Sequence, residues 1–166
     1  MCGGHSDPLT NVRARSPAVR ALAQRLREFY LLGGVAVNDE AWKTSELGDG
    51  YDYLAPDRSE IRLLLGFARG GMAHCTLPAG ATSAPVAHKT VDEVWYFLEG
   101  VGQVWRKKGD VEEVANVAAG RCLSIPKRTA FQFRNTGEEP LRLLISTMPA
   151  WPGPEEAERV EGYWPA

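Results

Sequence analysis

A series of short apolar segments separated by turn residues runs from residue 61 to residue 147 and limits the possible folds of the chain. The segments are IRLLLGF, MAHCTL, VWYFLEG, GQVWRKK, EEVANV, RCLSIP, AFQFRN and LRLLIST. The residues expected at turns are Gly100, Gly102, Gly109, Asp110, Gly120, Asn135 and Gly137, with a hairpin at Arg69-Gly70-Gly71. Many short strands at regular spacing are typical of an antiparallel sandwich or barrel. We therefore predict an all-β fold.

A helical pattern precedes the strands. Ser16 and Pro17 fit the N-cap and the first helical position of an α-helix. The apolar residues that then recur at helical spacing are Val19, Leu22, Leu26 and Phe29. Gly33-Gly34 ends the pattern. We predict an N-terminal α-helix whose apolar face is covered by the barrel or by a partner subunit.

These patterns divide the chain into four parts. The parts are a flexible N-terminus over 1–15, a helix with a connecting arm over 16–60, a barrel over 61–148 and an extended tail over 149–166. The N-terminus is small and polar without periodicity, which is typical of a mobile chain end. The tail is rich in proline and tryptophan, and we expect Trp151 and Trp164 to anchor it to the barrel or to a neighbour.

Composition excludes several classes of protein. Hydrophobic residues make up 44% of the chain and charged residues 24%, as in an ordinary globular domain. The net charge of −2 argues against nucleic acid as a partner. No apolar run reaches the roughly 18 residues that a membrane span needs, so no membrane partner is predicted. The cysteines are three and widely spaced, which indicates no disulfide framework and a cytoplasmic location.

Two stretches of the strand region carry glycines and polar residues at fixed intervals. The first is Gly80, five residues, Val86-Ala87-His88, four residues, Glu93, six residues and Gly100. The second is Gly120, five residues, Pro126-Lys127-Arg128, two residues, Phe131, three residues and Asn135. Both spacings resemble the two motifs of the cupin superfamily, and the resemblance covers residues 61–147. It implies an antiparallel cupin-like β-barrel, or jelly roll, which commonly pairs as a homodimer.

The metal-ligand positions of these motifs are only partly kept. Metal sites of the superfamily use three histidines and one glutamate. The resemblance places Val86 at the first histidine position and Phe131 at the third, so His88 and Glu93 remain as candidate ligands. A catalytic zinc site normally has three protein ligands. Arg128 also replaces the glycine of the second motif.

A third ligand would have to come from an earlier strand, where His74 and Cys75 are adjacent. Neighbouring residues of a strand face opposite ways, so at most one of them faces His88. Cysteine would give a soft ligand set and histidine a harder one. The divalent metals considered are Zn, Fe, Mn and Ni. The alternative is that both residues serve the core or the surface.

Strand alternation also predicts what surrounds the polar pair. The residues expected to line an apolar ligand pocket are Val86, Trp95, Phe97, Phe131 and Phe133. A buried Glu93 needs a partner, and we expect a hydrogen bond to His88 that favours the protonated imidazole. Such a pair is a candidate catalytic acid/base unit, or a structural polar contact without chemistry.

Three functions are therefore open. The first is a cupin that binds a small-molecule ligand in an apolar pocket with a His88/Glu93 polar centre, without metal or with weakly held metal. The second is a metal-dependent isomerase, cyclase or oxygenase of a small metabolite. The third is a structural or regulatory module with a solid barrel. Lys127-Arg128 at a strand end is also a candidate for recruiting an anion to the barrel rim.

Overall fold

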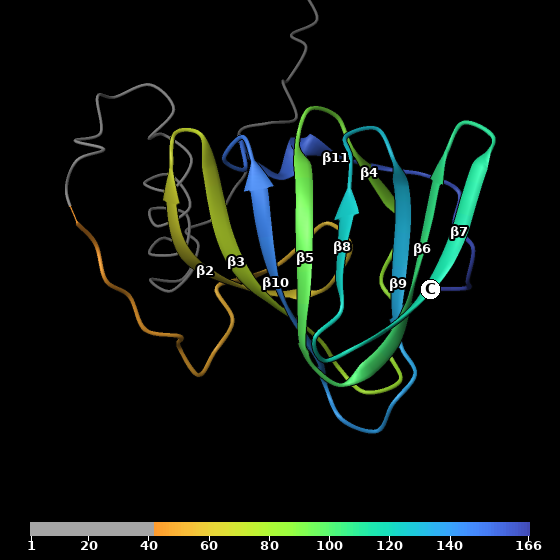
Figure 1. Cartoon of the computed structure of the whole chain (residues 1–166), viewed down its shortest axis with the longest axis horizontal. Coiled ribbons are helices and arrows are strands. Elements are labelled where there is room, and N and C mark those ends of the chain that lie inside the picture. The colour runs from red at the N-terminus through yellow and green to blue at the C-terminus, as the bar shows by residue number, and fades with distance from the viewer. Residues whose placement is uncertain (1–41) are drawn as a thin grey trace, which may run out of the picture.

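The computed structural model describes residues 42–166. These residues form two antiparallel β-sheets that face each other and enclose a core (Figure 1). The flexible segment predicted over 1–15 and the helix predicted from residue 16 to residue 34 lie outside the described residues. Within residues 42–166, no helix is long and apolar enough to cross a membrane.

Strands make up nearly all of the regular structure. The elements are β1 (Tyr53–Leu54), β2 (Glu60–Phe67), β3 (Gly70–Leu77), β4 (Val86–His88), β5 (Asp92–Glu99), β6 (Val101–Lys108), β7 (Val111–Ala118), β8 (Cys122–Ile125), β9 (Ala130–Asn135), β10 (Leu141–Met148), the 3₁₀-helix η1 (Pro154–Glu156) and β11 (Ala157–Arg159). The larger sheet has the order β1-β2-β3-β10-β5-β8, and the smaller has β11-β4-β9-β6-β7. The predicted all-β jelly roll is confirmed.

The alternation of side chains along β5 defines the inside of the barrel. Glu93, Trp95 and Phe97 are buried, whereas Val94 and Tyr96 between them are exposed. Successive side chains of a strand point to opposite faces of the sheet. One strand therefore directs a carboxyl group and two aromatic rings into the interior, as the sequence pattern predicts.

Trp95 lies at the centre of an aromatic cluster. Its ring contacts those of Phe97, Phe131 and Phe133 edge to face, with centroids 6.3, 5.4 and 5.0 Å apart. All four side chains are at most 1% exposed. Edge-to-face aromatic pairs stabilise a core beyond the apolar area that they bury. The cluster joins the two sheets, because Trp95 belongs to β5 and the rings of Phe131 and Phe133 come from β9.

The tail takes part in the barrel. Its strand β11 pairs with β4, so the smaller sheet extends beyond the predicted range of 61–148. The carboxylate of Glu156 accepts hydrogen bonds from the backbone N–H groups of Thr90 and Val91, at 2.5 and 2.9 Å. These bonds hold η1 against the turn between β4 and β5.

The end of the tail is also attached. The buried Gln132 accepts hydrogen bonds from the backbone N–H groups of Tyr163 and Trp164 and donates one to the carbonyl of Trp164. The guanidinium of Arg134 lies 4.5 Å from the centre of the Trp164 ring. The predicted anchoring of the tail on the barrel is confirmed.

Gly102 was expected at a turn, and that prediction is wrong. It lies within β6, where it pairs with Val117 of β7 and Asn135 of β9. A β-carbon at Gly102 would lie 2.4 Å from the carbonyl oxygen of Arg134 and 2.8 Å from a methyl carbon of Leu141. The glycine is required because the backbone of β9 and a core side chain approach it closely.

We expect Gly102→Ala to destabilise the protein by about 1–3 kcal/mol, because the added methyl group forces backbone and core to move. Urea denaturation measures the change in the free energy of unfolding. The matched control is Gly50→Ala, since no heavy atom lies within 4 Å of that position. The control should stay within about 0.5 kcal/mol of the parent. Equal stability of the two variants would contradict the close approach at Gly102.

Candidate functional site

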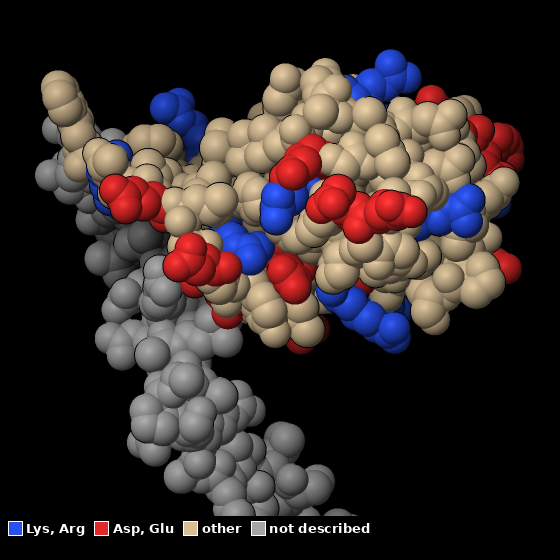
Figure 2. All heavy atoms as spheres, turned by 90° about the horizontal axis from the view of Figure 1, so that it is seen from below, with Lys and Arg blue, Asp and Glu red and all other residues tan. Residues whose placement is uncertain are grey.

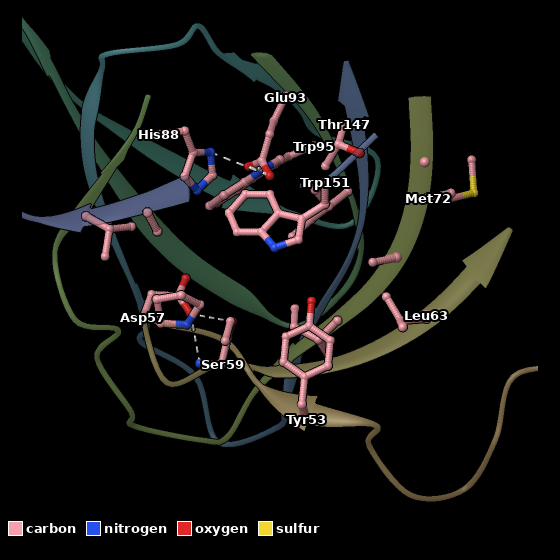
Figure 3. A pocket seen from close by; sticks show the side chains of 18 of the residues that line it. Tyr53, Asp57, Ser59, Leu63, Met72, His88, Glu93, Trp95, Thr147 and Trp151 are labelled. Carbon is pink, nitrogen blue, oxygen red and sulfur yellow. Dashed lines mark hydrogen bonds and ion pairs between the residues drawn. The ribbon is translucent and has the colours of Figure 1, made fainter. Parts of the chain in front are cut away.

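A cavity opens between the two sheets near the starts of β3 and β5 (Figure 3). Its lining residues are Tyr53, Ala55, Pro56, Asp57, Ser59, Ile61, Leu63, Gly71, Met72, Ala73, Val86, His88, Glu93, Trp95, Phe131, Ile145, Thr147, Trp151 and Ala157. The volume open to the centre of a water molecule is about 60 Å³. At about 10–15 Å³ of such volume for each water, the cavity suits a compact group of few heavy atoms. A cavity bounded by Trp95 and Phe131 counts against the solid barrel.

The two positions that lack a family histidine lie opposite each other. Val86 of β4 and Phe131 of β9 are direct cross-strand partners, and each is 1% exposed. Strand alternation places His88 on the same face as Val86. The wall of the cavity beside His88 is therefore apolar where further imidazoles would stand in a metal site.

Glu93 is buried in the wall of the cavity, and its hydrogen-bond partner lies in the same strand. The indole N–H of Trp95 donates to Glu93 Oε2 at 2.7 Å. Burial raises the pKa of Glu93 to about 8, and the indole hydrogen bond offsets this only in part. The carboxyl group is therefore protonated at neutral pH and offers both a donor and an acceptor.

His88 is held between aromatic rings. Its imidazole meets the rings of Phe131 and Trp151 edge to face, with centroids 5.0 and 4.8 Å away. Burial lowers the pKa of His88 to about 4, and the negative charge of Glu156 opposes this only weakly. The imidazole is therefore neutral at pH 7. Its buried Nδ1 has no hydrogen-bond partner among residues 42–166.

The predicted hydrogen bond between His88 and Glu93 is wrong. His88 Nδ1 and Glu93 Oε1 lie 3.7 Å apart, which is beyond hydrogen-bonding distance (Figure 3). The predicted preference for a protonated imidazole is also wrong, because desolvation disfavours charge on both groups. The two side chains form a neutral polar pair with space in front of it, rather than an ion pair.

Five polar or aromatic residues of the cavity were not predicted as site residues. They are Tyr53, Asp57, Ser59, Thr147 and Trp151. Asp57 is buried, and it accepts hydrogen bonds at Oδ1 from the backbone N–H and the hydroxyl of Ser59, at 2.9 and 2.7 Å. The sequence Asp57-Arg58-Ser59 signals such a local turn, but only the tertiary fold turns it toward the cavity.

Trp151 covers part of the cavity from the tail. Its ring lies beside His88, and its buried Nε1 has no hydrogen-bond partner among the described residues (Figure 3). Buried polar atoms are normally paired. Two unpaired nitrogens, one on Trp151 and one on His88, therefore line the same space.

Several residues predicted for the site lie elsewhere. Phe97 and Phe133 are fully buried in the core and do not line the cavity, whereas Val86, Trp95 and Phe131 do. Cys75 is fully buried in the hydrophobic core, and His74 faces the other side of β3. Neither of these two adjacent residues lines the cavity.

A divalent metal does not fit this donor set. Among the described residues, no three side chains of His, Cys, Asp or Glu stand close enough together to bind one ion. Glu93 already accepts a hydrogen bond from Trp95, and its raised pKa disfavours the charged form that a metal needs. No chemical step through a metal follows from these residues.

Comparison with known proteins agrees with the architecture. A family model described as a cupin domain matches residues 73–147. The uncharacterized protein MJ1618 of Methanocaldococcus jannaschii is 30% identical over 104 residues, which cover 60% of this chain and 80% of that protein. A double-stranded β-helix protein from Klebsiella pneumoniae has a TM-score of 0.53 at 16% identity, covering 78% of this chain and 98% of its own. BH2720 of Bacillus halodurans has a TM-score of 0.51 at 22% identity, covering 55% and 70%.

Two antiparallel sheets that face each other, with a cavity between them at one end, define the class of jelly-roll barrels, also called double-stranded β-helices. Within that class, the chain belongs to the cupin superfamily. The matched segment begins in β3 and ends in β10, so it contains His88, Glu93 and Phe131.

The pKa of Glu93 predicts a pH dependence of stability. Because its folded value of about 8 exceeds the unfolded value of 4.5, its stabilising contribution is complete below pH 4.5 and is lost as the pH rises through about 8. The contribution of His88 runs the other way and is lost as the pH falls from 6.5 to about 4. Between about pH 6.5 and 9, Glu93→Gln should therefore flatten the decline in the free energy of unfolding.

Urea denaturation at several pH values in that range measures how steeply the free energy of unfolding falls with pH. The matched control is Glu138→Gln, which removes an exposed carboxylate and should leave the slope of the parent unchanged. An unchanged slope in Glu93→Gln would show that this carboxyl group does not titrate as a buried acid.

The register of β4 and β9 can be tested by restoring the family ligands. In the double variant Val86→His, Phe131→His, four ligand side chains would meet, because the two positions are cross-strand partners beside His88. We expect the affinity for Zn²⁺ to rise on the order of 100-fold or more. Isothermal titration calorimetry measures it, with Val86→His alone as the intermediate control. An unchanged affinity in a folded double variant would disprove the register.

Proposed function

We propose that this cupin binds a small uncharged molecule in its barrel cavity, through the His88/Glu93 pair and without a resident metal. The observation that carries the proposal is the unpaired Nδ1 of His88, buried in the cavity wall beside Glu93. A buried polar atom without a partner costs free energy, which a ligand with a hydrogen-bonding oxygen would recover.

The side chains that line the cavity indicate the chemistry of the ligand. Protonated Glu93 donates to a carbonyl or hydroxyl oxygen, and the neutral imidazole of His88 accepts from or donates to the same group. The remaining wall is mainly apolar, with Ile61, Leu63 and Ile145 among the residues that line it. A compact ligand with an apolar body and one polar oxygen fits this arrangement. A carboxylate fits less well, because it would lose its water without gaining a cationic partner. No lysine or arginine of the described part of the chain lines the cavity, and the imidazole of His88 is neutral.

A specific observation favours acid/base catalysis as a second candidate. The pKa of Glu93 of about 8 leaves a proton available near neutral pH, and a neutral imidazole lies 3.7 Å away. Perturbed acids in clefts are candidates for proton transfer. Glu93 would then donate its proton to a bound carbonyl oxygen, and the unpaired Nδ1 of the neutral His88 would accept an α-proton from the ligand, which converts the ketone into its enol without a leaving group.

The homodimer implied by the family resemblance stays a prediction. The outer face of the larger sheet carries apolar side chains on β5, with Val94, Tyr96 and Leu98 each between 38% and 46% exposed. Apolar side chains gathered on one face are typical of association surfaces. They support a pairing of two chains through this sheet.

Ligand binding can be tested with compact probes. Cyclopentanol and cyclopentanone should shift the NMR signals of the indole N–H groups of Trp95 and Trp151, and cyclopentanecarboxylate should bind more weakly. His88→Ala should weaken binding about 3- to 10-fold, because one hydrogen bond is lost. The matched control is His74→Ala, which removes a buried histidine outside the cavity.

Binding that is equally weakened by both histidine variants, or strongest for the carboxylate, would reject the proposed ligand chemistry. The same titration in D₂O separates binding from catalysis. Exchange of the α-protons of cyclopentanone that disappears in Glu93→Gln would assign an acid/base role, whereas binding without exchange supports a binding protein.

A further inference from the structure

A second concave site lies on the outside of the smaller sheet. The residues that line it include Ala87 and Ala130, the cations Lys89, Lys107, Lys108 and Arg128, and the carboxylate of Glu158. The volume open to the centre of a water molecule is about 690 Å³, far larger than that of the barrel cavity. The segments that form it are the β4–β5 turn, the β6–β7 hairpin and the β8–β9 loop, which meet at one end of the barrel (Figure 1).

The strand register of the smaller sheet explains why a groove forms here. One row of cross-strand partners runs from Lys107 on β6 through Ala130 on β9 and Ala87 on β4 to Glu158 on β11. Alanine is small, so the two central positions form a low floor between longer side chains. Ala87 faces this groove, while its neighbours Val86 and His88 face the barrel cavity. The groove and the cavity are therefore separate sites on opposite faces of β4.

The walls of the groove carry an excess of positive charge. They contain four cationic side chains and a single carboxylate, Glu158. Among residues 42–166, none of the four cations forms an ion pair with a carboxylate. The ammonium groups of Lys89 and Lys108 donate to the carbonyls of Glu155 and Lys127, at 2.6 and 3.0 Å. These bonds hold the ammonium groups in place and leave each with further donors for an anion.

Among the described residues, the opposite end of the barrel has no such excess of positive charge on its visible face. Seen from below, acidic and basic side chains lie next to one another (Figure 2). Arg142 and Glu99 form an ion pair there, at the strand ends of β10 and β5. The positive charge of the groove is therefore a local feature of a chain whose net charge is −2.

Arg128 adds an independent observation. Its φ of +62° lies in the left-handed region, which is unfavourable for a residue with a β-carbon. The second cupin motif has glycine at this position, and glycine takes such a conformation without strain. The backbone N–H of Arg128 donates to the carbonyl of His88 at 2.7 Å, which fixes the turn. A strained arginine on the wall of a cationic groove indicates that its side chain has a role there.

We propose that this groove binds a small phosphorylated ligand, with Arg128 and Lys107 contacting the phosphate and the alanine floor admitting it. A phosphate carries up to two negative charges and presents several acceptor oxygens to one face. The planar guanidinium of arginine suits bidentate contact with phosphate, and the lysines contribute as point charges. Glu158 at the far side of the groove accepts hydrogen bonds from hydroxyl groups of the ligand.

Isothermal titration calorimetry of the full chain with inorganic pyrophosphate at low ionic strength tests the proposal. The substitution Arg128→Gly should weaken binding about tenfold, because it removes a charge-assisted contact. It should also raise the Tm by about 2–4 °C, because it restores the residue that the turn prefers. Lys107→Gln should weaken binding in the same direction.

The matched control is Arg58→Gly. Arg58 has a φ of +74° and does not line the groove, so this variant removes the same strain and the same charge elsewhere. It should raise the Tm without changing the affinity for pyrophosphate. Equal weakening by both glycine variants, or no binding to the parent at millimolar pyrophosphate, would overturn the proposal. Binding of citrate as tight as that of pyrophosphate would overturn the assignment to phosphate.

Discussion

Trp95 is buried between the two sheets, and the barrel and its cavity are built around this side chain. Its ring joins Phe97 of its own strand to Phe131 and Phe133 of the facing sheet, so it holds the two sheets together. An unpaired indole N–H in such a core would cost free energy, and the acceptor available two residues earlier is Glu93. One side chain therefore packs the barrel and fixes the carboxyl group in the wall of the cavity.

The cavity and the groove use opposite electrostatic principles. In the cavity, burial keeps both His88 and Glu93 uncharged, so recognition there depends on hydrogen bonds to a neutral ligand. In the groove, four exposed cationic side chains outnumber a single carboxylate and favour an anion. Both sites share β4, whose alternating side chains divide between them, and the hydrogen bond from Arg128 to the carbonyl of His88 joins their backbones.

The sequence predicted the barrel, and with it the inward position of Val86, His88, Glu93, Trp95 and Phe131, because strand alternation follows from backbone geometry. Prediction from the sequence failed where contacts between distant segments determine the position of a residue. Gly102 was assigned to a turn, since the approach of Arg134 and Leu141 has no local signal. Phe97 and Phe133 were assigned to the pocket, although a strand pattern gives the face of a side chain and not its depth. The tail supplied Trp151 and Glu156, which lie far from the motifs in the chain.

Residue type and spacing are enough to predict the superfamily, the two strand faces and the absence of histidines at positions 86 and 131. The chemistry of the remaining His88 and Glu93, in contrast, depends on contacts that form in the folded chain. Whether a buried histidine and glutamate form an ion pair or a neutral pair depends on their separation and on how far water is excluded. Here the separation is 3.7 Å and both side chains are buried, so the remnant of a metal motif is an uncharged polar pair facing a small cavity.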